Sequence, residues 1–274
     1  MKKIRSMYRK FGTAVEVFEA KIDRMSCCLK EMCVDQVTAE EKKEFEDEID
    51  ILRSLPPQNS HIVEYIGFQK TPDKIQLFMG MYNGSILDLI TMNMKKERKF
   101  SVKQICSMCE QILMGIIILH GRNVLHRDLK CSNIFYEGDC KKFDTLYFVL
   151  GDFGDSKILT DSKTATMRKG TPSWKAPEVY ECDGDKNYSY PSDMWSFGMV
   201  MYEMMTLTFP YCGDNFPASS IVNGKLPVIR QEDRVLYNVI IPLWESIVER
   251  SPEKRCKPHD ALRTVTMMIE EIVK

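Results

Sequence analysis

The stretch VLHRDLKCSNIF, residues 124–135, places a histidine, two cations, an aspartate and an asparagine between two apolar pairs. Charges this dense, next to residues that favour burial, are costly unless each charge has a partner. A surface loop would hold them without cost. A functional interpretation therefore requires that the rest of the chain supplies those partners.

Composition sets the broad class of the protein. With 274 residues, the chain is long enough for one large domain or for two lobes that share an interface. A content of 44% hydrophobic and 28% charged residues is typical of a globular protein. The net charge of −1 argues against a general nucleic-acid binder. Two short basic clusters, residues 1–10 and 94–99, are interpreted as solvated faces.

The ten cysteines are scattered along the chain and do not suggest a disulfide framework. Cys106 and Cys109 form a single C-x-x-C, which we interpret as two small apolar groups on one helix face rather than a zinc site. No segment is predicted to span a membrane, because apolar runs such as residues 112–119 are too short. Reduced thiols without a signal peptide predict a cytoplasmic protein.

The first eighty residues are predicted to form strands with one inserted helix. That helix lies within residues 38–57, where Thr38 and Glu41 form a capping box and two prolines end the pattern. Its apolar stripe consists of Phe45, Ile49 and Leu52. Glu48 falls inside this stripe and needs a cation, for which the nearest upstream candidate is Lys30, in an apolar strand.

The second part of the chain, after a connector near residues 80–84, is predicted to be mainly helical. A helix over 101–121 begins at a capping box of Ser101 and Gln104, and Gly121 is expected to cap its end. A further helix starts near Ser192. It is apolar nearly all round, which predicts that it lies at the centre of this part.

The opening stretch matches the pattern H-R-D-L-K-x-x-N, whose six fixed letters coincide by chance at only about one position in 10⁷–10⁸. With this pattern the chain resembles the eukaryotic protein kinase family, over roughly residues 8–272. Further motifs follow in the family's order: CCLK at 27–30, DFG at 152–154, APE at 176–178, DMWSFG at 193–198 and SPEKR at 251–255. In the family, the arginine of the last motif, here Arg255, pairs with the glutamate of APE, here Glu178.

The resemblance implies an α+β, bilobal protein kinase fold. Residues 1–80 would form a small, β-rich N-lobe with the Glu48 helix, and residues 81–274 a larger, mainly helical C-lobe. It also implies a serine/threonine kinase that uses ATP and Mg²⁺ and acts on a protein substrate.

Phosphoryl transfer depends on positioning the phosphates and neutralising their charge. The resemblance implies that Lys30 holds the α- and β-phosphates and that Glu48 orients Lys30. Asp152 and Asn133 would supply oxygen ligands of the kind that Mg²⁺ prefers.

The resemblance also assigns the catalytic set Asp128, Lys130 and Asn133. Asp128 would accept or orient the proton of the attacking hydroxyl, and Lys130 would reach the transferring phosphoryl group. His126 would pack against the DFG turn. The implied nucleotide contacts are Lys10, Gly12, Val15, Val17, Cys28, Lys30, Glu48, Met79, Met81, Phe135 and Asp152.

Substrate class and regulation follow from smaller features. In the family, a lysine at the position of Lys130 and a segment such as GTPSW, with Thr171, mark serine/threonine enzymes. The sequence around APE and over residues 192–204 most resembles the tyrosine-kinase-like group. Arg127 is expected to pair with a residue phosphorylated by an upstream kinase or by autophosphorylation. The activation loop, residues 155–170, offers Thr160, Ser162, Thr164 and Thr166 as phosphorylation sites. Of these we favour Thr166 and then Thr164.

Several positions depart from the family's pattern. The three glycine positions of the phosphate loop fall on Lys10, Gly12 and Val15, so only the middle glycine is present. The connector has Gly80 in place of an acidic residue and is one residue short, which makes either Met79 or Phe78 the gatekeeper, the residue at the back of the nucleotide pocket.

The degenerate loop leaves a second hypothesis open, a catalytically weak pseudokinase that acts as a scaffold or nucleotide-sensing switch. The active kinase is favoured because the chain retains all six charged or amide residues of the site, which are Lys30, Glu48, Asp128, Lys130, Asn133 and Asp152. A metabolite kinase on a similar fold is the weakest alternative, because it has no need of GTPSWKAPE.

Overall fold

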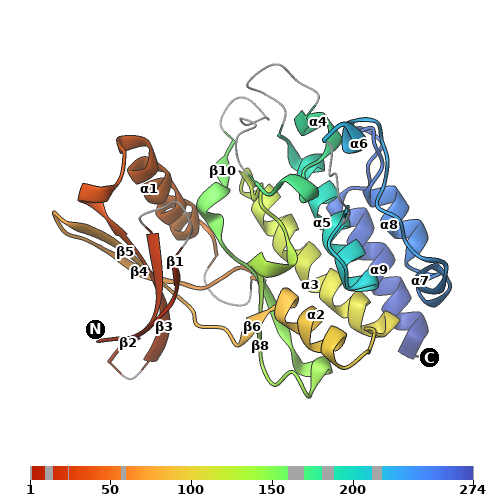
Figure 1. The fold of residues 1–274 in the computed structure, drawn as a ribbon, viewed down its shortest axis with the longest axis horizontal. Helices are drawn as coiled ribbons and strands as arrows, with labels where there is room; N and C mark the ends of the chain where they lie inside the picture. Colours follow the sequence, from red (N-terminus) through yellow and green to blue (C-terminus); the bar gives the residue numbers. More distant parts are fainter. Residues whose placement is uncertain are drawn as a thin grey trace.

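The computed structural model describes residues 2–9, 15–23, 25–56, 60–159, 170–180, 188–211 and 218–273. Figure 1 shows two lobes, with the largest sheet and helix α1 on one side and the remaining helices on the other. This arrangement confirms the predicted bilobal α+β fold, with a β-rich N-lobe and a helical C-lobe.

The N-lobe sheet has five strands in the order β1-β2-β3-β5-β4, and every neighbouring pair is antiparallel. Their bounds are β1 Lys2–Arg9, β2 Val15–Ile22, β3 Met25–Cys33, β4 Tyr65–Lys70 and β5 Lys74–Met79. Lys30 pairs with Val17 on one side and Leu77 on the other, and Cys28 pairs with Met79. Because side chains alternate between the two faces of a strand, Cys28 and Lys30 point to the same face.

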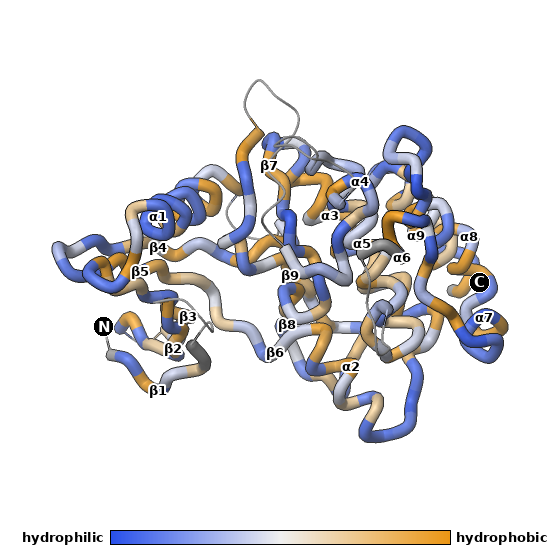
Figure 2. The backbone as a smooth tube through the Cα atoms, turned by 45° about the horizontal axis from the view of Figure 1, so that its top comes forward, coloured by the Kyte–Doolittle hydropathy of each residue, from blue (hydrophilic) through white to orange (hydrophobic). Residues whose placement is uncertain are grey.

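Helix α1, Ala39–Ser54, has the predicted capping box, in which the Thr38 side chain and the Glu41 side chain each bond the other's backbone amide. The apolar stripe is buried as predicted, and Glu48 is buried within it. In Figure 2 most of α1 is hydrophilic, which agrees with a helix that buries only one face. The capping box fixes the start of α1, and the apolar stripe determines which face of the helix is buried.

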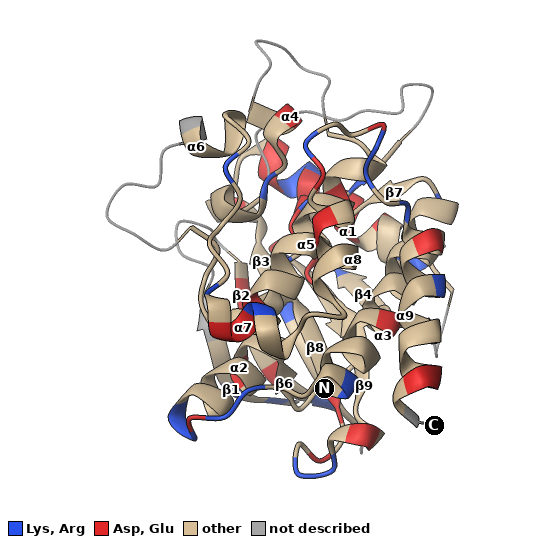
Figure 3. Cartoon of the chain, turned by 90° about the vertical axis from the view of Figure 1, so that its right-hand side faces the viewer, with Lys and Arg blue, Asp and Glu red and all other residues tan. Residues whose placement is uncertain are grey.

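The C-lobe is built around buried helices. The helices are α2 Ile86–Lys95, α3 Val102–Gly121, α4 Pro177–Tyr180, α5 Tyr190–Thr206, α6 Ala218–Val222, α7 Gln231–Leu236, α8 Ile241–Ile247 and α9 Pro258–Val273. Every residue of α5 from 192 to 206 is buried, as the all-round apolar pattern predicted. Figure 3 shows α5 largely without charged residues, whereas α9 carries several.

Helix α3 begins at the predicted Ser101–Gln104 capping box and buries Cys106 and Cys109 on its apolar face. By length and composition alone α3 could cross a membrane, but it packs against α5, α9 and β9, and 50% of its apolar stretch is buried in the protein. We therefore interpret α3 as a core helix.

The expected cap at Gly121 was wrong in position. Gly121 is still helical, and the left-handed backbone that ends the turn falls on Asn123, with φ of 58°. Asparagine tolerates this conformation better than most residues, which explains the shift of two positions.

Short strands bring the segments that contain the predicted catalytic residues to the lobe boundary. They are β6 Gly84–Ser85, β7 Val124–Leu125, β8 Ile134–Glu137, β9 Tyr147–Leu150 and β10 Lys157–Ile158, in sheets of order β6-β8-β9 and β10-β7. Backbone bonds of 2.8 Å join Leu150 to His61 and Val63, which lie just before β4. The N-lobe is thereby tied to the strand that precedes the DFG motif.

The described side chains of both basic clusters, residues 3–7 and 94–99, are exposed, as predicted. The described side chains of β1 are exposed, and Lys3 and Arg5 form ion pairs with Glu31 and Glu19. In the second cluster, residues 94–99 are exposed, although Lys99 also pairs with Asp233.

Candidate functional site

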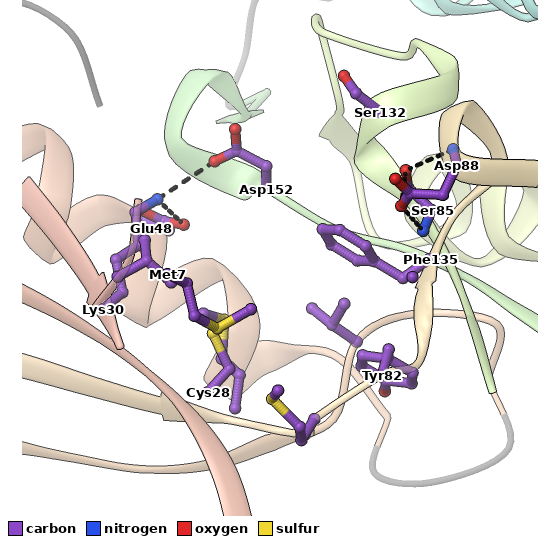
Figure 4. A pocket seen from close by; sticks show the side chains of 16 residues that line it. Met7, Cys28, Lys30, Glu48, Tyr82, Ser85, Asp88, Ser132, Phe135 and Asp152 are labelled. Carbon is purple, nitrogen blue, oxygen red and sulfur yellow. Dashed lines mark hydrogen bonds and ion pairs between the residues drawn. The ribbon is translucent and has the colours of Figure 1, made fainter. Parts of the chain in front are cut away.

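Lys30, Glu48 and Asp152 meet in the cleft between the lobes. The ammonium Nζ of Lys30 lies 2.7 and 2.8 Å from the two carboxylate oxygens of Glu48 and 3.2 Å from Oδ1 of Asp152. Lys30 and Glu48 are only 5% and 2% exposed. The predicted ion pair is confirmed, and Figure 4 shows Lys30 in contact with both Glu48 and Asp152.

The DFG turn holds Asp152 in this position. Asp152 has a left-handed backbone, with φ of 55°, and Phe153 after it is buried. The ring of His126 lies 5.1 Å from the ring of Phe153, and Nε2 of His126 lies 3.0 Å from the carbonyl oxygen of Gly151. His126 therefore packs against this turn, as predicted, and supports the strained residue Asp152.

Asp128 is the centre of a dense hydrogen-bond network. Its Oδ2 lies 2.7 Å from Nζ of Lys130 and accepts from Nδ2 of Asn133 at 2.9 Å. Its Oδ1 accepts from the backbone amide and the hydroxyl of Thr171, at 2.9 and 2.6 Å. The Thr171 hydroxyl also lies 2.8 Å from Nζ of Lys130. These contacts supply the partners that the opening stretch required.

The network also sets the charge state of Asp128. Burial raises the pKa of this carboxyl, but the charge of Lys130 and hydrogen bonds from Lys130 and Thr171 outweigh burial, and the pKa is lowered overall. Asp128 is therefore a carboxylate at neutral pH.

Asp193, at the start of α5, holds the backbone of the loop that contains Asp128. Its carboxylate accepts from the backbone amides of His126 and Arg127, both at 3.0 Å, and from the Tyr188 hydroxyl at 3.2 Å. Burial raises the pKa of Asp193, but His120, 2.9 Å away, and the other donors lower it overall. Arg127, with φ of 66°, is held in a left-handed conformation between these bonds.

A cavity of about 270 Å³ lies beside the ion pair, between the lobes. It is lined by Met7, Val17, Cys28, Lys30, Glu48, Val63, Met79, Gly80, Met81, Tyr82, Gly84, Ser85, Asp88, Ser132, Phe135 and Asp152 (Figure 4). Burial raises the pKa of the Cys28 thiol to about 11, so Cys28 is an uncharged wall residue at neutral pH.

The register of β5 distinguishes the two gatekeeper candidates. Met79 pairs with Cys28 and lines the cavity. Phe78 instead packs with Ala20, Cys27 and Leu29, in a separate cluster. Of the two candidates, Met79 is therefore the one that lines the cavity.

The connector leads into the floor of the cavity. Tyr82 stacks on Phe135, with ring centroids 6.1 Å apart and planes 10° apart. The Tyr82 hydroxyl accepts from the backbone amide of Glu64 at 3.0 Å, and the Gly80 amide donates to the Glu64 carbonyl at 2.9 Å. These bonds hold the shortened connector along the edge of the cavity.

Other predicted site residues have different placements. Lys10, Gly12, Thr164 and Thr166 lie outside the described residues. Val15 does not line the cavity; it is buried at the start of β2, opposite Met32. Asp128, Lys130 and Asn133 lie in the loop that borders the cavity at Ser132.

The predicted pair of Arg255 and Glu178 is also confirmed. The guanidinium Nη1 and Nη2 of Arg255 lie 2.7 and 3.0 Å from the two carboxylate oxygens of Glu178. Ser192 of α5 donates to the same glutamate at 2.9 Å. The segment that contains APE is thereby anchored to the core of the C-lobe.

Sequence reasoning missed several contributors to the site. The motifs include Asp193 and Thr171, but no contact with the catalytic loop is predicted for either residue, although an aspartate at the start of an apolar helix requires buried donors. Met7 and Tyr82 also line the cavity without having been predicted to do so. Met7 lies in a basic cluster that was interpreted as solvated, and Tyr82 directly follows the predicted Met81. Ser85 and Asp88 line the cavity but also form a capping box for α2, which is a sufficient local reason for their presence.

The oxygen atoms at the site fit a hard divalent cation. Asn133 donates its amide nitrogen to the backbone oxygen and the carboxylate of Asp128, so its amide oxygen, 3.5 Å from the Ser132 hydroxyl, is the atom that could face a cation. Asp152 supplies a carboxylate at the edge of the cavity. Two oxygen donors suit Mg²⁺ shared with a bound phosphate, whereas no protein-only cluster of three metal-binding side chains occurs among the described residues.

Comparison with known proteins gives a consistent picture. A family model described as protein kinase domain matches residues 10–267. Probable serine/threonine-protein kinase nek3 of Dictyostelium discoideum is 32% identical over 260 residues, covering 92% of this chain and 22% of that protein.

Two further relatives come from an animal and a plant. Human serine/threonine-protein kinase Nek5 is 31% identical, covering 75% of this chain and 27% of that protein. Mitogen-activated protein kinase kinase kinase 3 of Arabidopsis thaliana is 32% identical, covering 73% of this chain and 31% of that protein. The chain thus spans less than a third of the length of these curated relatives. Placement in the tyrosine-kinase-like group stays a prediction.

Proposed function

The chain belongs to the protein kinase domain family, and we propose that it is a serine/threonine protein kinase that transfers the γ-phosphoryl group of ATP to protein hydroxyls. One observation carries this proposal. The buried Lys30–Glu48 pair and Asp152 line one cavity, and the Asp128 network lies in the loop that borders this cavity at Ser132. Such a set of preorganised charges matches what phosphoryl transfer requires.

The N-lobe side of the site would hold the nucleotide. Lys30, kept in place by Glu48, would bind the α- and β-phosphates, and the stacked rings of Tyr82 and Phe135 would border the base. Asp152 and Asn133 would hold Mg²⁺, which neutralises phosphate charge when bound. The two lobes meet at the connector, and we place their boundary near residue 80.

The C-lobe side would position the acceptor hydroxyl. A carboxylate with a lowered pKa is a weak base, so Asp128 would mainly orient the hydroxyl and take its proton late. Lys130, between Asp128 and Thr171, is placed to contact the transferring group. Thr171 holds both residues and acts as a positioning residue.

Two wider assignments belong to the same proposal. The protein would act in signalling, with its own activity controlled by an upstream kinase or by autophosphorylation. It would be cytoplasmic, which is supported by the eight cysteines of the described residues, all of them free thiols.

A phosphotransfer assay tests the proposed function. Purified protein is incubated with Mg·ATP and a generic basic protein, and phosphoserine and phosphothreonine are measured. We expect both modifications with the wild type and neither with Asp128→Asn. Equal labelling by the two proteins would contradict the proposal, and no labelling by either would favour the pseudokinase alternative.

Replacing Val15 by glycine is expected to improve nucleotide binding. Glycine at this position lets the phosphate loop bend and its amides approach the phosphates. We expect KM for ATP to fall about fivefold, which corresponds to about 1 kcal/mol or one hydrogen bond, with little change in kcat.

Val15 is buried, so this substitution also removes core packing. Val15→Ala is the matched control, because it loses the same apolar contacts without the conformational freedom of glycine. Steady-state kinetics on both variants separate the effects. An unchanged KM in Val15→Gly, or an equal fall in Val15→Ala, would rule out the loop as the cause.

Phosphorylation of the activation loop is expected to raise activity. Arg127 is buried beside Asp155 and precedes Asp128, so a phosphate paired with it would help to order the catalytic loop. One charge-assisted hydrogen bond is worth about 1.5–3 kcal/mol, so Thr164→Ala/Thr166→Ala should lose about tenfold or more in rate. Mass spectrometry of active protein should find phosphate on Thr166 or Thr164. An unmodified loop, with full activity in the double variant, would exclude this control.

A further inference from the structure

Helix α5 supports two neighbouring parts of the site from one face, which we call the α5 face. Ser196, Val200 and Glu203 are spaced by four and three residues, so they share this face. The Ser196 hydroxyl donates to the backbone oxygen of Trp174 at 2.8 Å. The Cys131 thiol contacts the backbone oxygen of Val200 at 3.9 Å. The α5 face therefore holds both the segment that contains GTPSW and the loop that contains HRDLK.

These two segments carry residues that meet in the Asp128 network. Cys131 directly follows Lys130 in the loop. Trp174 closes a short turn by donating its backbone amide to the backbone oxygen of Thr171 at 3.1 Å, and Thr171 in turn bonds Asp128. A shift of either segment on the α5 face therefore changes the surroundings of Asp128.

Glu203 is a buried carboxyl group on the α5 face, and its side chain is only 1% exposed. The Trp174 indole and the Cys131 thiol, one from each segment, act on it as donors. The Trp174 contact is not a formed hydrogen bond, because Oε2 of Glu203 and Nε1 of Trp174 are both buried without a bonded partner among the described residues. Buried polar atoms are costly to leave unpaired, so this pair gains free energy if the contact closes.

The charge of Glu203 changes near neutral pH. Burial raises the pKa of its carboxyl to about 7, although the two donors oppose this. Burial also raises the pKa of Cys131, of Cys109 on α3 near it, and of Tyr188 beside Ser196, so these groups keep their protons there. No charged side chain among the described residues contributes to the pKa shift of Glu203. Glu203 is therefore the group on the α5 face that titrates.

We propose that Glu203 is a positioning residue that draws the two segments around Asp128 together when its carboxyl is charged, so that phosphotransfer weakens as the pH falls through neutrality. The carboxylate accepts from Trp174 and Cys131 more strongly than the neutral acid does, since charge-assisted hydrogen bonds are about twice as strong as neutral ones. Uptake of one proton from solvent loosens both contacts. This inference rests on the proposed kinase function and adds a pH-dependent support to the same site.

An NMR titration tests the coupling without an activity assay. The chain has three tryptophans, and nitrogen-15 labelling gives each an indole N–H signal, of which Trp174→Phe identifies one by its loss. We expect the Trp174 signal of the wild type to move with pH, with a midpoint near 7, and to stay fixed in Glu203→Gln. The Trp244 indole already donates to the Gly198 carbonyl at 2.9 Å and serves as the internal reference that should not titrate.

A kinetic comparison tests the effect on phosphotransfer. Glu203→Gln keeps the shape of the side chain and an acceptor oxygen but does not ionise. The ratio of wild-type kcat to variant kcat, measured with one peptide and Mg·ATP, cancels ionisations of the peptide, the nucleotide and Asp128. We expect this ratio to fall about fivefold from about pH 8 to about pH 6, the scale of the difference between a charge-assisted and a neutral hydrogen bond.

Trp174→Phe gives a second variant for the kinetic comparison. It removes the indole N–H but keeps an aromatic ring against Phe209, so it should reduce the pH dependence without a change at Glu203. Thermal melting at each pH checks that the variants are folded. The wild-type NMR titration needs no variant of Glu203, so the test stands even if Glu203→Gln fails to fold.

The outcomes separate the two proposals. A Trp174 signal that does not titrate in the wild type, or that titrates equally in Glu203→Gln, would overturn the inference whether or not the protein is an active kinase. A titrating signal with a kcat ratio that is independent of pH would overturn it too, and would leave the kinase assignment standing. Failure to phosphorylate any peptide or generic protein at any pH would overturn the kinase assignment, and the inference with it.

Discussion

Asp128→Asn should lower kcat by about 10²–10⁴-fold, the range for loss of a general base in the transition state. Asparagine has nearly the same shape and can still accept from the amide and hydroxyl of Thr171, so the loop should stay folded. It lacks the negative charge that Lys130 and the acceptor proton require. KM for ATP should change little, because Asp128 does not line the nucleotide cavity.

Asp144→Asn is the matched control for this prediction. Asp144 is an exposed aspartate that pairs with Lys103, away from the cavity, so its amide variant should keep full activity. Stopped-time assays at saturating Mg·ATP measure both variants. An Asp128→Asn protein within tenfold of the wild type would remove Asp128 from the catalytic set.

Lys30→Met should reduce kcat/KM for phosphotransfer by about 10²–10³-fold, the scale for losing one preorganised charge contact. Methionine preserves the length and apolar packing of the side chain but leaves the buried carboxylate of Glu48 without its ammonium. The loss should include weaker nucleotide binding, because the same ammonium lies at the edge of the cavity beside Asp152.

Lys74→Met serves as the matched control, since Lys74 is a partly exposed cation on the neighbouring strand β5 and pairs with Glu31. Its variant should retain activity within a few-fold of wild type, because the buried Glu31 keeps its bonds from Lys3 and Gln76 and neither Lys74 nor Glu31 lines the cavity. Near-normal kinetics for Lys30→Met, measured beside this control, would be incompatible with the proposed site.

The parts of the site that could be predicted from sequence are those where a charge interrupts an apolar pattern. Glu48 inside the stripe of α1 and Lys30 inside an apolar strand each needed a partner, and the ion pair follows from that need. The fold and the catalytic residues were predicted from the HRDLK, DFG and APE motifs, through their resemblance to those of protein kinases. Local capping rules likewise placed the starts of α1 and α3.

The remaining features depend on contacts between distant segments or on register. Thr171 reaches Asp128 across 43 positions in the chain, and Asp193 supports the loop from another helix. The choice of Met79 over Phe78 needed the pairing of β3 with β5, because a shift of one residue reverses the face of every side chain. Helix α3 ends at Gly121, but the left-handed residue that follows the helix is Asn123, a position that the local pattern did not distinguish from Gly121.

The central claim is that this site transfers a phosphoryl group rather than only binding nucleotide. The most direct measurement is mass spectrometry of a serine-containing peptide after incubation with Mg·ATP, with nucleotide binding measured on the same protein samples. We expect the wild type to add one phosphoryl group to the serine, and Asp128→Asn to bind ATP equally well while leaving the peptide unmodified. A wild-type protein that binds ATP but never modifies any peptide would contradict the account and identify a pseudokinase.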